Sequence, residues 1–413
     1  MQNLKNTMCF KTWYDLTIHL PESYFYWCCK TIRDKEQIEP TKFDINILNE
    51  KGLDYFIKNP IIQKRKKELT SGIRSKECSD CWRSEDSSGV SFRTSYYGND
   101  FSKKTDDDII QESQQDLTRK IEIVLTNKCN SACVYCWEGL SSRWQKETGN
   151  KFEDTKQDEF DKIIRILNDY WTTELKNHRY LSISLLGGEP FFTEHLFYFI
   201  ENFVNKLSIE NQILEIEITT NLNYSQKVMD RFFNLIKNNN RVTYIINVSA
   251  EAIENKFEYI RWGSSWNTWD NNFEYLINKY YEHQNIKISI GSAHNSLSLP
   301  YALDFLKYIE RKEIKFPIIL TSNWVDFPYP MSVSALPASF KDNIQETIDY
   351  VNTMKTKIIR KSDYIRNLET IKSMLGTAND EKSKIFFHTL EKRRNISFSD
   401  VFPHFSELVK TDK

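Results

Sequence analysis

The sequence lacks a long hydrophobic run and lacks an excess of charge of either sign. No stretch approaches the roughly 20 apolar residues that span a bilayer, and residues 1–8 lack the apolar core of a signal peptide. The 56 Lys and Arg residues balance 57 Asp and Glu residues, so no global attraction to nucleic acid or to an anionic membrane is indicated. We therefore expect a cytoplasmic protein with no membrane partner and no strong nucleic-acid partner.

Cysteine is also lacking from most of the chain, because none of the eight cysteines follows Cys136 in 413 residues. Cysteines that merely filled a core would not be confined to the first third of the sequence. In a reducing compartment they serve as ligands or reactive groups more often than as disulfides. Their placement therefore indicates metal or redox chemistry near the N-terminus.

Residues 1–100 show little clean periodicity. Residues 12–20 alternate loosely and predict a strand, and the aromatic run 24–27 predicts a second strand that completes a hairpin. Residues 60–72 predict a helix with the basic run Lys64-Arg-Lys-Lys67. Since the net charge is balanced, we interpret this run as a solvated helix face, although nucleic-acid binding is the alternative. The polar, acidic segment 97–117 predicts a linker.

Residues 118–330 alternate between strand-like and helix-like patterns. Strands are expected at 120–126, 181–186, 214–220, 242–249, 285–291 and 316–321, and helices at 155–171, 194–207, 224–238, 267–282 and 300–312. Such alternation predicts right-handed βαβ units and a parallel α/β sheet. Six strands are fewer than the eight of a full barrel, so we predict an open or partial barrel with its ligand site at the carboxyl ends of the strands. Residues 331–413 predict helices at 338–359, 363–375 and 381–393, which we interpret as a cap or packing element.

Three cysteines follow the first of these strands in one loop. Cys129, Cys133 and Cys136 have C-x3-C-x2-C spacing. Thiolates hold iron–sulfur clusters, and three ligands would leave one iron of a [4Fe–4S] cube without a protein ligand. An open iron can bind and activate a small molecule, as an open zinc position can. Zinc also binds thiolates, but it usually takes four ligands, and the sequence shows no fourth nearby.

A Gly-Gly-Glu-Pro turn ends the second strand of this region. Gly187 and Gly188 let the backbone approach a ligand closely, and the carboxylate of Glu189 could accept hydrogen bonds from a ligand ammonium group. A tight strand-to-helix turn would also explain the glycines and Pro190. Because the carboxyl ends of parallel strands share one edge of a sheet, we expect this turn at the same end as the cysteine loop.

Together the two motifs resemble the radical S-adenosylmethionine (radical SAM) superfamily. The resemblance covers about residues 118–325 and includes Tyr135 before the last cysteine. It implies a partial (β/α)6 barrel in which Cys129, Cys133 and Cys136 hold a [4Fe–4S] cluster whose open iron binds SAM. An electron from a reductant such as flavodoxin or ferredoxin would cleave SAM and yield a 5′-deoxyadenosyl radical, which abstracts hydrogen from a substrate.

The resemblance also implies which residues contact SAM. Gly187, Gly188 and Glu189 would orient its amino group, and Asn221 follows Thr220 at a polar position near SAM. Ser249 and Glu251 match a polar pair that reaches the ribose or carboxylate, although the family more often has Asp at the second position. Arg261 matches a basic residue that binds the SAM carboxylate bidentately, with a solvated charge at a helix start as the alternative. Residues 288–291 and Asn295 would support the adenine and ribose, and His294 beside them is either functional or an ordinary loop residue.

The remaining cysteines form a second group near the N-terminus. Their layout resembles the SPASM/twitch auxiliary domains of radical SAM enzymes and implies another [4Fe–4S] cluster, held by Cys9, Cys28, Cys78 and Cys81. In three respects the sequence departs from that family: Ser23 replaces a usual glycine, the module precedes the barrel, and the cysteines suffice for one auxiliary cluster rather than two. Structural zinc is the alternative metal, and Cys29 is the alternative to Cys28 as a ligand.

We therefore expect a radical SAM enzyme, an oxidoreductase, in four parts. Residues 1–100 form the auxiliary domain, 101–117 the linker, 118–330 the radical SAM barrel and 331–413 the helical region. A peptide or protein is the first substrate expected, because family members with auxiliary domains often modify peptides, and a sugar or nucleoside is the second. A non-catalytic iron–sulfur or zinc protein is the alternative of another class, but it would not need a SAM-binding turn. No motif identifies a catalytic acid or base.

Overall fold

The structure is a computed structural model that describes residues 4–28, 41–89, 91–94, 103–114, 118–151, 153–173, 180–209, 212–359, 361–376, 381–403 and 405. The chain forms two compact units. The first contains residues 1–128, 152–218 and 227–245, and the second contains residues 129–151, 219–226 and 246–413. Among the described helices, none is long and apolar enough to cross a membrane.

A mostly parallel sheet runs through the α/β region. Hydrogen bonds order the strands β10-β9-β8-β7-β6-β5-β4-β1-β2-β3. The six expected strands are β4 (Lys120–Val124), β5 (Tyr180–Leu186), β6 (Ile213–Thr220), β7 (Val242–Ser249), β8 (Ile286–His294) and β9 (Ile318–Trp324). Each lies beside its neighbour in sequence, and the pairings β4–β5, β5–β6 and β8–β9 are parallel. The predicted α/β class with a parallel sheet is therefore confirmed.

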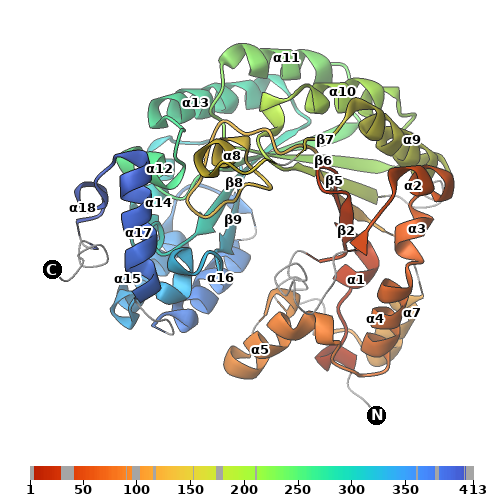
Figure 1. Cartoon of the computed structure of the whole chain (residues 1–413), viewed down its shortest axis with the longest axis horizontal. Coiled ribbons are helices and arrows are strands. Elements are labelled where there is room, and N and C mark those ends of the chain that lie inside the picture. The colour runs from red at the N-terminus through yellow and green to blue at the C-terminus, as the bar shows by residue number, and fades with distance from the viewer. Residues whose placement is uncertain are drawn as a thin grey trace. The chain divides into compact units, whose positions relative to one another are not determined.

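Along the chain, amphipathic helices alternate with these strands (Figure 1). They are α8 (Ser142–Thr148), α9 (Gln157–Thr173), α10 (Glu194–Asn202), α11 (Gln226–Ile236), α12 (Glu254–Ile260), α13 (Trp266–Glu282) and α14 (Ala302–Arg311), with short 3-10 turns η5 (Pro190–Phe192), η6 (Val204–Lys206) and η7 (Leu299–Tyr301). Apolar side chains at helical spacing face inward, as in α9, where Phe160, Ile163, Ile164 and Leu167 are buried. The five expected helices are thus present with shifted ends.

The N-terminal segment adds strands to this sheet. Residues 12–20 were expected to form a single strand, but they contain helix α1 (Lys11–Tyr14) followed by β1 (Asp15–His19). The predicted hairpin is confirmed, because β1 pairs antiparallel with β2 (Tyr24–Tyr26), which pairs with β3 (Thr41–Lys42). On its other side β1 pairs in parallel with β4. All five β1 residues are buried, which explains why their pattern alternates poorly.

Short helices make up much of the described N-terminal segment. They are η1 (Leu4–Asn6), α2 (Ile45–Lys51), α3 (Asp54–Ile57), α4 (Pro60–Thr70), η3 (Lys76–Cys78), α5 (Ser79–Ser88) and α7 (Asp106–Ser113). Helix α7 lies inside the segment expected to be a linker. Thr105 and Asp108 form a capping box at its start, Ile109 is buried, and the Trp13 indole donates to the Ser113 carbonyl at 2.9 Å. The acidic run therefore belongs to a packed helix. Its charges occupy the first turn, where the helix dipole favours negative charge.

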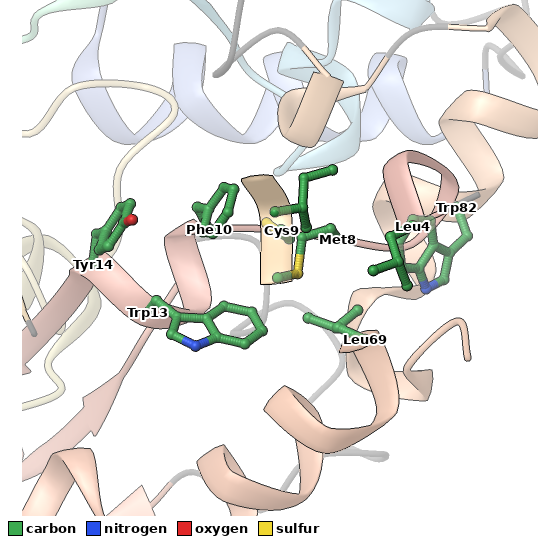
Figure 2. Packing of buried hydrophobic residues seen from close by; sticks show 9 residues of the cluster. Leu4, Met8, Cys9, Phe10, Trp13, Tyr14, Leu69 and Trp82 are labelled. Carbon is green, nitrogen blue, oxygen red and sulfur yellow. The ribbon is translucent and has the colours of Figure 1, made fainter. Parts of the chain in front are cut away.

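Figure 2 shows the hydrophobic cluster that packs α1, α4, α5 and α7 together. Phe10 and Trp13 from the start of the chain pack in it with Leu69 of α4 and Trp82 of α5, and Cys9 belongs to the same cluster. Segments about 60 and 70 residues apart in sequence thus share one core. This core fixes the spacing between Cys9 and the Cys78–Cys81 segment.

The C-terminal region is helical but less regular than expected. The stretch 338–359, expected to be one helix, divides into η10 (Ala338–Phe340), α15 (Lys341–Thr353) and a two-residue strand, β10 (Ile358–Ile359), which pairs with β9. The other elements are η8 (Tyr329–Met331), η9 (Val333–Ala335), α16 (Lys361–Met374), α17 (Glu381–Arg394) and α18 (Phe398–Val401). Helix α16 packs against α15 and β9. His404 lies outside the described residues.

Candidate iron–sulfur sites

The cysteine loop of the second unit is held by backbone hydrogen bonds to the last residue of α12 and to a residue just after it. The Ala132 amide donates to the Trp262 carbonyl at 2.7 Å, and the Val134 amide donates to the Ile260 carbonyl at 2.8 Å. Within the loop the Cys136 amide donates to the Cys133 carbonyl at 2.9 Å, and the Trp144 indole donates to the same carbonyl at 2.8 Å. These bonds fix an irregular backbone that presents Cys129, Cys133 and Cys136, all half-buried, from a single loop.

Burial makes two of these thiols reluctant to ionise without a metal. It raises the pKa of Cys136 to about 12 and raises the pKa of Cys133, while the charge of Arg261 opposes the shift at Cys133. A thiolate is the form that ligates metal, so metal binding here would release protons. The loop is therefore suited to a cationic iron–sulfur core that replaces those protons.

A buried polar network lies beside the loop. The Arg261 guanidinium donates to the Glu251 carboxylate from Nε at 3.2 Å and from Nη2 at 2.5 Å, and the Tyr135 hydroxyl donates to the same carboxylate at 3.3 Å. Arg261 is the C-cap of α12 and is buried. The interpretation of Arg261 as a solvated charge at a helix start is thus wrong, since the charge is compensated inside the unit by Glu251.

The other residues expected near SAM are distributed around the same unit. Asn221 is bonded to the cysteine loop, because its amide donates to Asn130 Oδ1 at 2.7 Å and to Ser131 Oγ at 3.2 Å. Ser249 is half-buried at the last position of β7. The Asn295 side chain accepts from the Leu297 and Ser298 amides, so it closes a local turn.

His294 is the last residue of β8 and is buried rather than placed in a loop. The Tyr364 hydroxyl lies 3.4 Å from its Nε2. Burial lowers the pKa of His294 to about 4, so the imidazole is neutral at physiological pH. His294 therefore lies in the core, where its side chain on β8 faces Tyr364 of α16.

Arg394 is a neighbour of the cysteine loop that sequence reasoning missed. It comes from the end of α17 and donates to the Ala132 carbonyl at 2.9 Å and to the Glu147 carboxylate at 3.1 Å. Its guanidinium carbon lies 4.8 Å from the Trp144 ring centroid and 5.4 Å from that of Trp262. Only a run of basic residues, 392–394, marks this position in the sequence.

The Gly-Gly-Glu-Pro turn belongs to the first unit, where it packs against the end of β4. A Cβ on Gly187 would lie 2.4 Å from Val124 Cγ1, and one on Gly188 would lie 2.2 Å from the Lys128 carbonyl oxygen. Both glycines have positive φ, and the Glu189 amide donates to the Lys128 carbonyl at 2.8 Å. Both residues must therefore be glycine for the turn to reach the residue that precedes Cys129. Glu189 is buried and its Oε1 accepts from the Phe191 amide at 3.0 Å.

The four N-terminal cysteines expected to act together line one cavity of the first unit. Cys9, Cys28, Cys78 and Cys81 all contribute to its wall. Burial raises the pKa of Cys78 to about 12, against the nearby charge of Arg65, and the neighbouring Cys9 and Cys81 raise it further. Cys9 and Cys78, about 70 positions apart in the sequence, therefore line the same cavity. Cys29, the alternative to Cys28, lies outside the described residues.

The interpretation of Lys64–Lys67 as a solvated helix face is wrong for two of its residues. Arg65 and Lys66 are buried, and Arg65 lines the cysteine cavity. They lie on the inner face of α4 with Ile62 and Leu69, and this i, i+3/i+4, i+7 spacing is the sequence signal that could have identified them.

Ser23, which replaces the usual glycine, has φ of +53° in the turn between β1 and β2. The position demands the left-handed conformation that glycine adopts readily. Serine reaches this conformation at a cost of about 1–2 kcal/mol. Ser23 therefore occupies a left-handed turn position, and β1 and β2 still pair on either side of it.

Both groups of thiols fit iron–sulfur chemistry by their donor type and their protein environment. In the part of the chain that the structure describes, no three His, Cys, Asp or Glu side chains are arranged to hold a single metal ion. The loop offers three thiols beside a buried Arg–Glu pair, and the cavity offers four thiols beside Arg65.

Comparison with known proteins identifies the region that contains the loop. Residues 123–291 match the sequence model of the radical SAM superfamily. No curated protein matches the chain. Among solved structures, the crystal structure of HydG, a maturase of the [FeFe]-hydrogenase, is similar over 82% of this chain and 70% of its own, at 12% identity and a TM-score of 0.34.

The matched residues include Cys129, Cys133, Cys136, the Gly-Gly-Glu-Pro turn, Glu251 and Arg261. A radical SAM domain implies a [4Fe–4S] cluster and SAM as cofactors. Residues 123–291 are therefore a radical SAM domain, and the protein is an enzyme of the radical SAM type.

Proposed function

We propose that this enzyme is a cytoplasmic oxidoreductase of two clusters, in which an N-terminal SPASM/twitch-like module holds an auxiliary [4Fe–4S] cluster through Cys9, Cys28, Cys78 and Cys81. The shared cavity of these four cysteines is the observation that supports it. Residues 118–330 would form a partial (β/α)6 barrel for SAM, and residues 331–413 a helical extension. A peptide or protein is the preferred substrate, and a sugar or nucleoside is the alternative.

The residues of the chain have distinct roles in this proposal. Cys129, Cys133 and Cys136 hold the SAM-activating cluster, and Asn221 and Arg394 keep their loop in one conformation through bonds to Asn130 and Ala132. Gly187, Gly188 and Glu189 orient the SAM amino group. Ser249, Glu251 and Arg261 are the further SAM contacts, with Glu251 neutralising Arg261 while the site is empty of ligand.

When bound, the cluster supplies the electron that cleaves SAM to methionine and a 5′-deoxyadenosyl radical. A small reductant protein such as flavodoxin or ferredoxin would deliver that electron. The chain's task is to position SAM and the substrate and to exclude competing reactions. The half-buried cysteines and the buried Arg261–Glu251 pair support such an enclosed site.

Anaerobic reconstitution followed by iron and sulfide analysis tests the proposal. We expect about eight irons per chain, because each cubane contains four, and formation of 5′-deoxyadenosine from SAM under reducing conditions. Cys133→Ala should abolish that product and lower the iron content to about four. Cys78→Ala should lower the iron content by the same amount.

Two results would count against the proposal. Zinc in place of iron at the N-terminal cysteines would show a structural metal there. Iron loss in Cys133→Ala without a second loss in Cys78→Ala would show that the enzyme has one cluster. To separate the substrate classes, the purified enzyme can be incubated with peptides or with sugars and nucleosides, and 5′-deoxyadenosine production above the uncoupled rate can be measured for each.

A further inference from the structure

Arg65 carries an almost fully buried guanidinium group. Its residue exposure is 1%, and none of its three side-chain nitrogens has a hydrogen-bond partner among the residues that the structure describes. A buried charged donor without such partners is costly unless something else satisfies it. The environment of Arg65 therefore requires an explanation.

The protein surroundings compensate Arg65 only in part. Its Nη2 lies 3.5 Å from Glu77 Oε2, and its guanidinium carbon lies 4.1 Å from the centroid of the Trp27 ring. The Glu77 carboxylate already accepts a hydrogen bond from the Ser75 hydroxyl. The aromatic face and one ion pair lower the cost of burying the charge, but they leave the planar set of N–H donors unused.

The other cations around the same cavity differ from Arg65 in this respect. Arg93 forms a bidentate pair with Glu85 and also donates to the Lys5 and Met8 carbonyls. Lys11 is hydrogen-bonded to Asp15. Arg65, in contrast, lines the same cavity as the four cysteines, and its charge acts on the Cys78 thiol, but its N–H groups have no hydrogen-bond partner among the described residues.

We propose that Arg65 is a positioning residue for the auxiliary cluster, to whose sulfur atoms it donates N–H hydrogen bonds and whose negative charge it offsets. The inference rests on the proposed function, since it requires a [4Fe–4S] cluster at Cys9, Cys28, Cys78 and Cys81. A cluster with four thiolate ligands is an anion, and uptake of one electron makes it more negative. Net charge and hydrogen bonds to the sulfurs set the reduction potential, so Arg65 stabilises the reduced form.

The test isolates the auxiliary cluster in the full-length chain. In a background with Cys129, Cys133 and Cys136 changed to Ala, only the N-terminal site can hold iron. One-electron reduction by dithionite is followed by EPR as a function of solution potential. At the solution potential where the cluster of the background chain is half reduced, Arg65→Gln should lower the ratio of reduced to oxidised cluster about tenfold. This change corresponds to a midpoint potential that is lower by about 59 mV.

Arg65→Lys should give a smaller shift, because it keeps the charge and loses the fork of donors. The matched control is Arg74→Gln. Arg74 also lies over a Trp ring and pairs with a carboxylate, Asp86, but it is exposed and does not line the cavity. That variant should leave the midpoint unchanged. A midpoint unchanged in Arg65→Gln would overturn the proposal and leave Arg65 a structural residue.

Glu77→Gln provides a second test if Arg65→Gln fails to hold iron. It removes the carboxylate nearest the guanidinium, so the midpoint should rise, opposite to the Arg65→Gln shift. A fall or no change would overturn the proposal. Failure of the proposed function gives a different result. The background chain itself would then contain no iron, or would contain zinc in place of iron, before any change at Arg65.

Discussion

Arg261 and Glu251 form an ion pair in which both side chains are almost completely buried. Their shortest N–O distance is 2.5 Å, and Glu251 is 1% exposed. Tyr135, one residue before Cys136, donates to the same carboxylate at 3.3 Å. The pair thus links α12 to the cysteine loop inside the second unit.

Breaking this pair should be more harmful than removing it. Arg261→Met leaves a buried carboxylate without its cation, and we expect a loss of about 3–5 kcal/mol in unfolding free energy. The double variant Glu251→Gln, Arg261→Met should be destabilised by less than the sum of the two single variants. Urea denaturation of the four chains gives this coupling energy, and simple additivity would contradict it.

Gly188 should tolerate no side chain, because of a contact as well as its backbone conformation. Gly188→Ala places Cβ against the Lys128 carbonyl, whereas Gly149 has φ of +78° and no atom within 4 Å of an added Cβ. Gly149→Ala should cost about 1–2 kcal/mol for the left-handed conformation alone. Gly188→Ala should cost about 1–3 kcal/mol more for overpacking and should weaken SAM binding. Thermal unfolding and SAM titration measure the two effects, and equal losses in both variants would refute the contact argument.

Arg394 should support activity from outside the matched radical SAM domain. Arg394→Met removes the bonds to Ala132 and Glu147, and we expect a loss of roughly 2–3 kcal/mol with lower iron retention in the cysteine loop. Arg393→Met is the matched control, because Arg393 is adjacent and exposed, and it should change stability by about 0.5 kcal/mol or less. Denaturation midpoints and iron content after gel filtration are the measurements. Similar behaviour of the two variants would remove Arg394 from the loop's support.

Stability should depend on pH through His294. Its pKa is about 4 in the folded chain and about 6.5 when unfolded, so between these values the unfolded state binds a proton that the folded state excludes. Stability is therefore full above pH 6.5 and falls as the pH is lowered toward 4. The His294 contribution should be about 2 kcal/mol lower at pH 5 than at pH 7. Urea denaturation of wild type and His294→Phe at both pH values tests this, and equal pH dependence in the two chains would contradict it.

The sequence alone was sufficient where a local pattern carries the structure. Strand and helix periodicity predicted the order β4 to β9 and the helices between them, because each element must bury one face and expose the other. The spacing of Cys129, Cys133 and Cys136 indicated an iron–sulfur loop, and the match of residues 123–291 confirmed its radical SAM context.

Tertiary structure decided the features that depend on partners distant in sequence. The sequence marked 106–113 as a polar linker, but Trp13 and a capping box make it a packed helix. Arg65 looked like one charge of a solvated run, and the sequence analysis did not single out Arg394, yet each is buried against residues far along the chain. Helical spacing can place a charged residue such as Arg65 on the inner face of a helix, but it does not show what compensates the charge, because the carboxylate, ring or carbonyl that lowers the cost of burial is brought close only by folding.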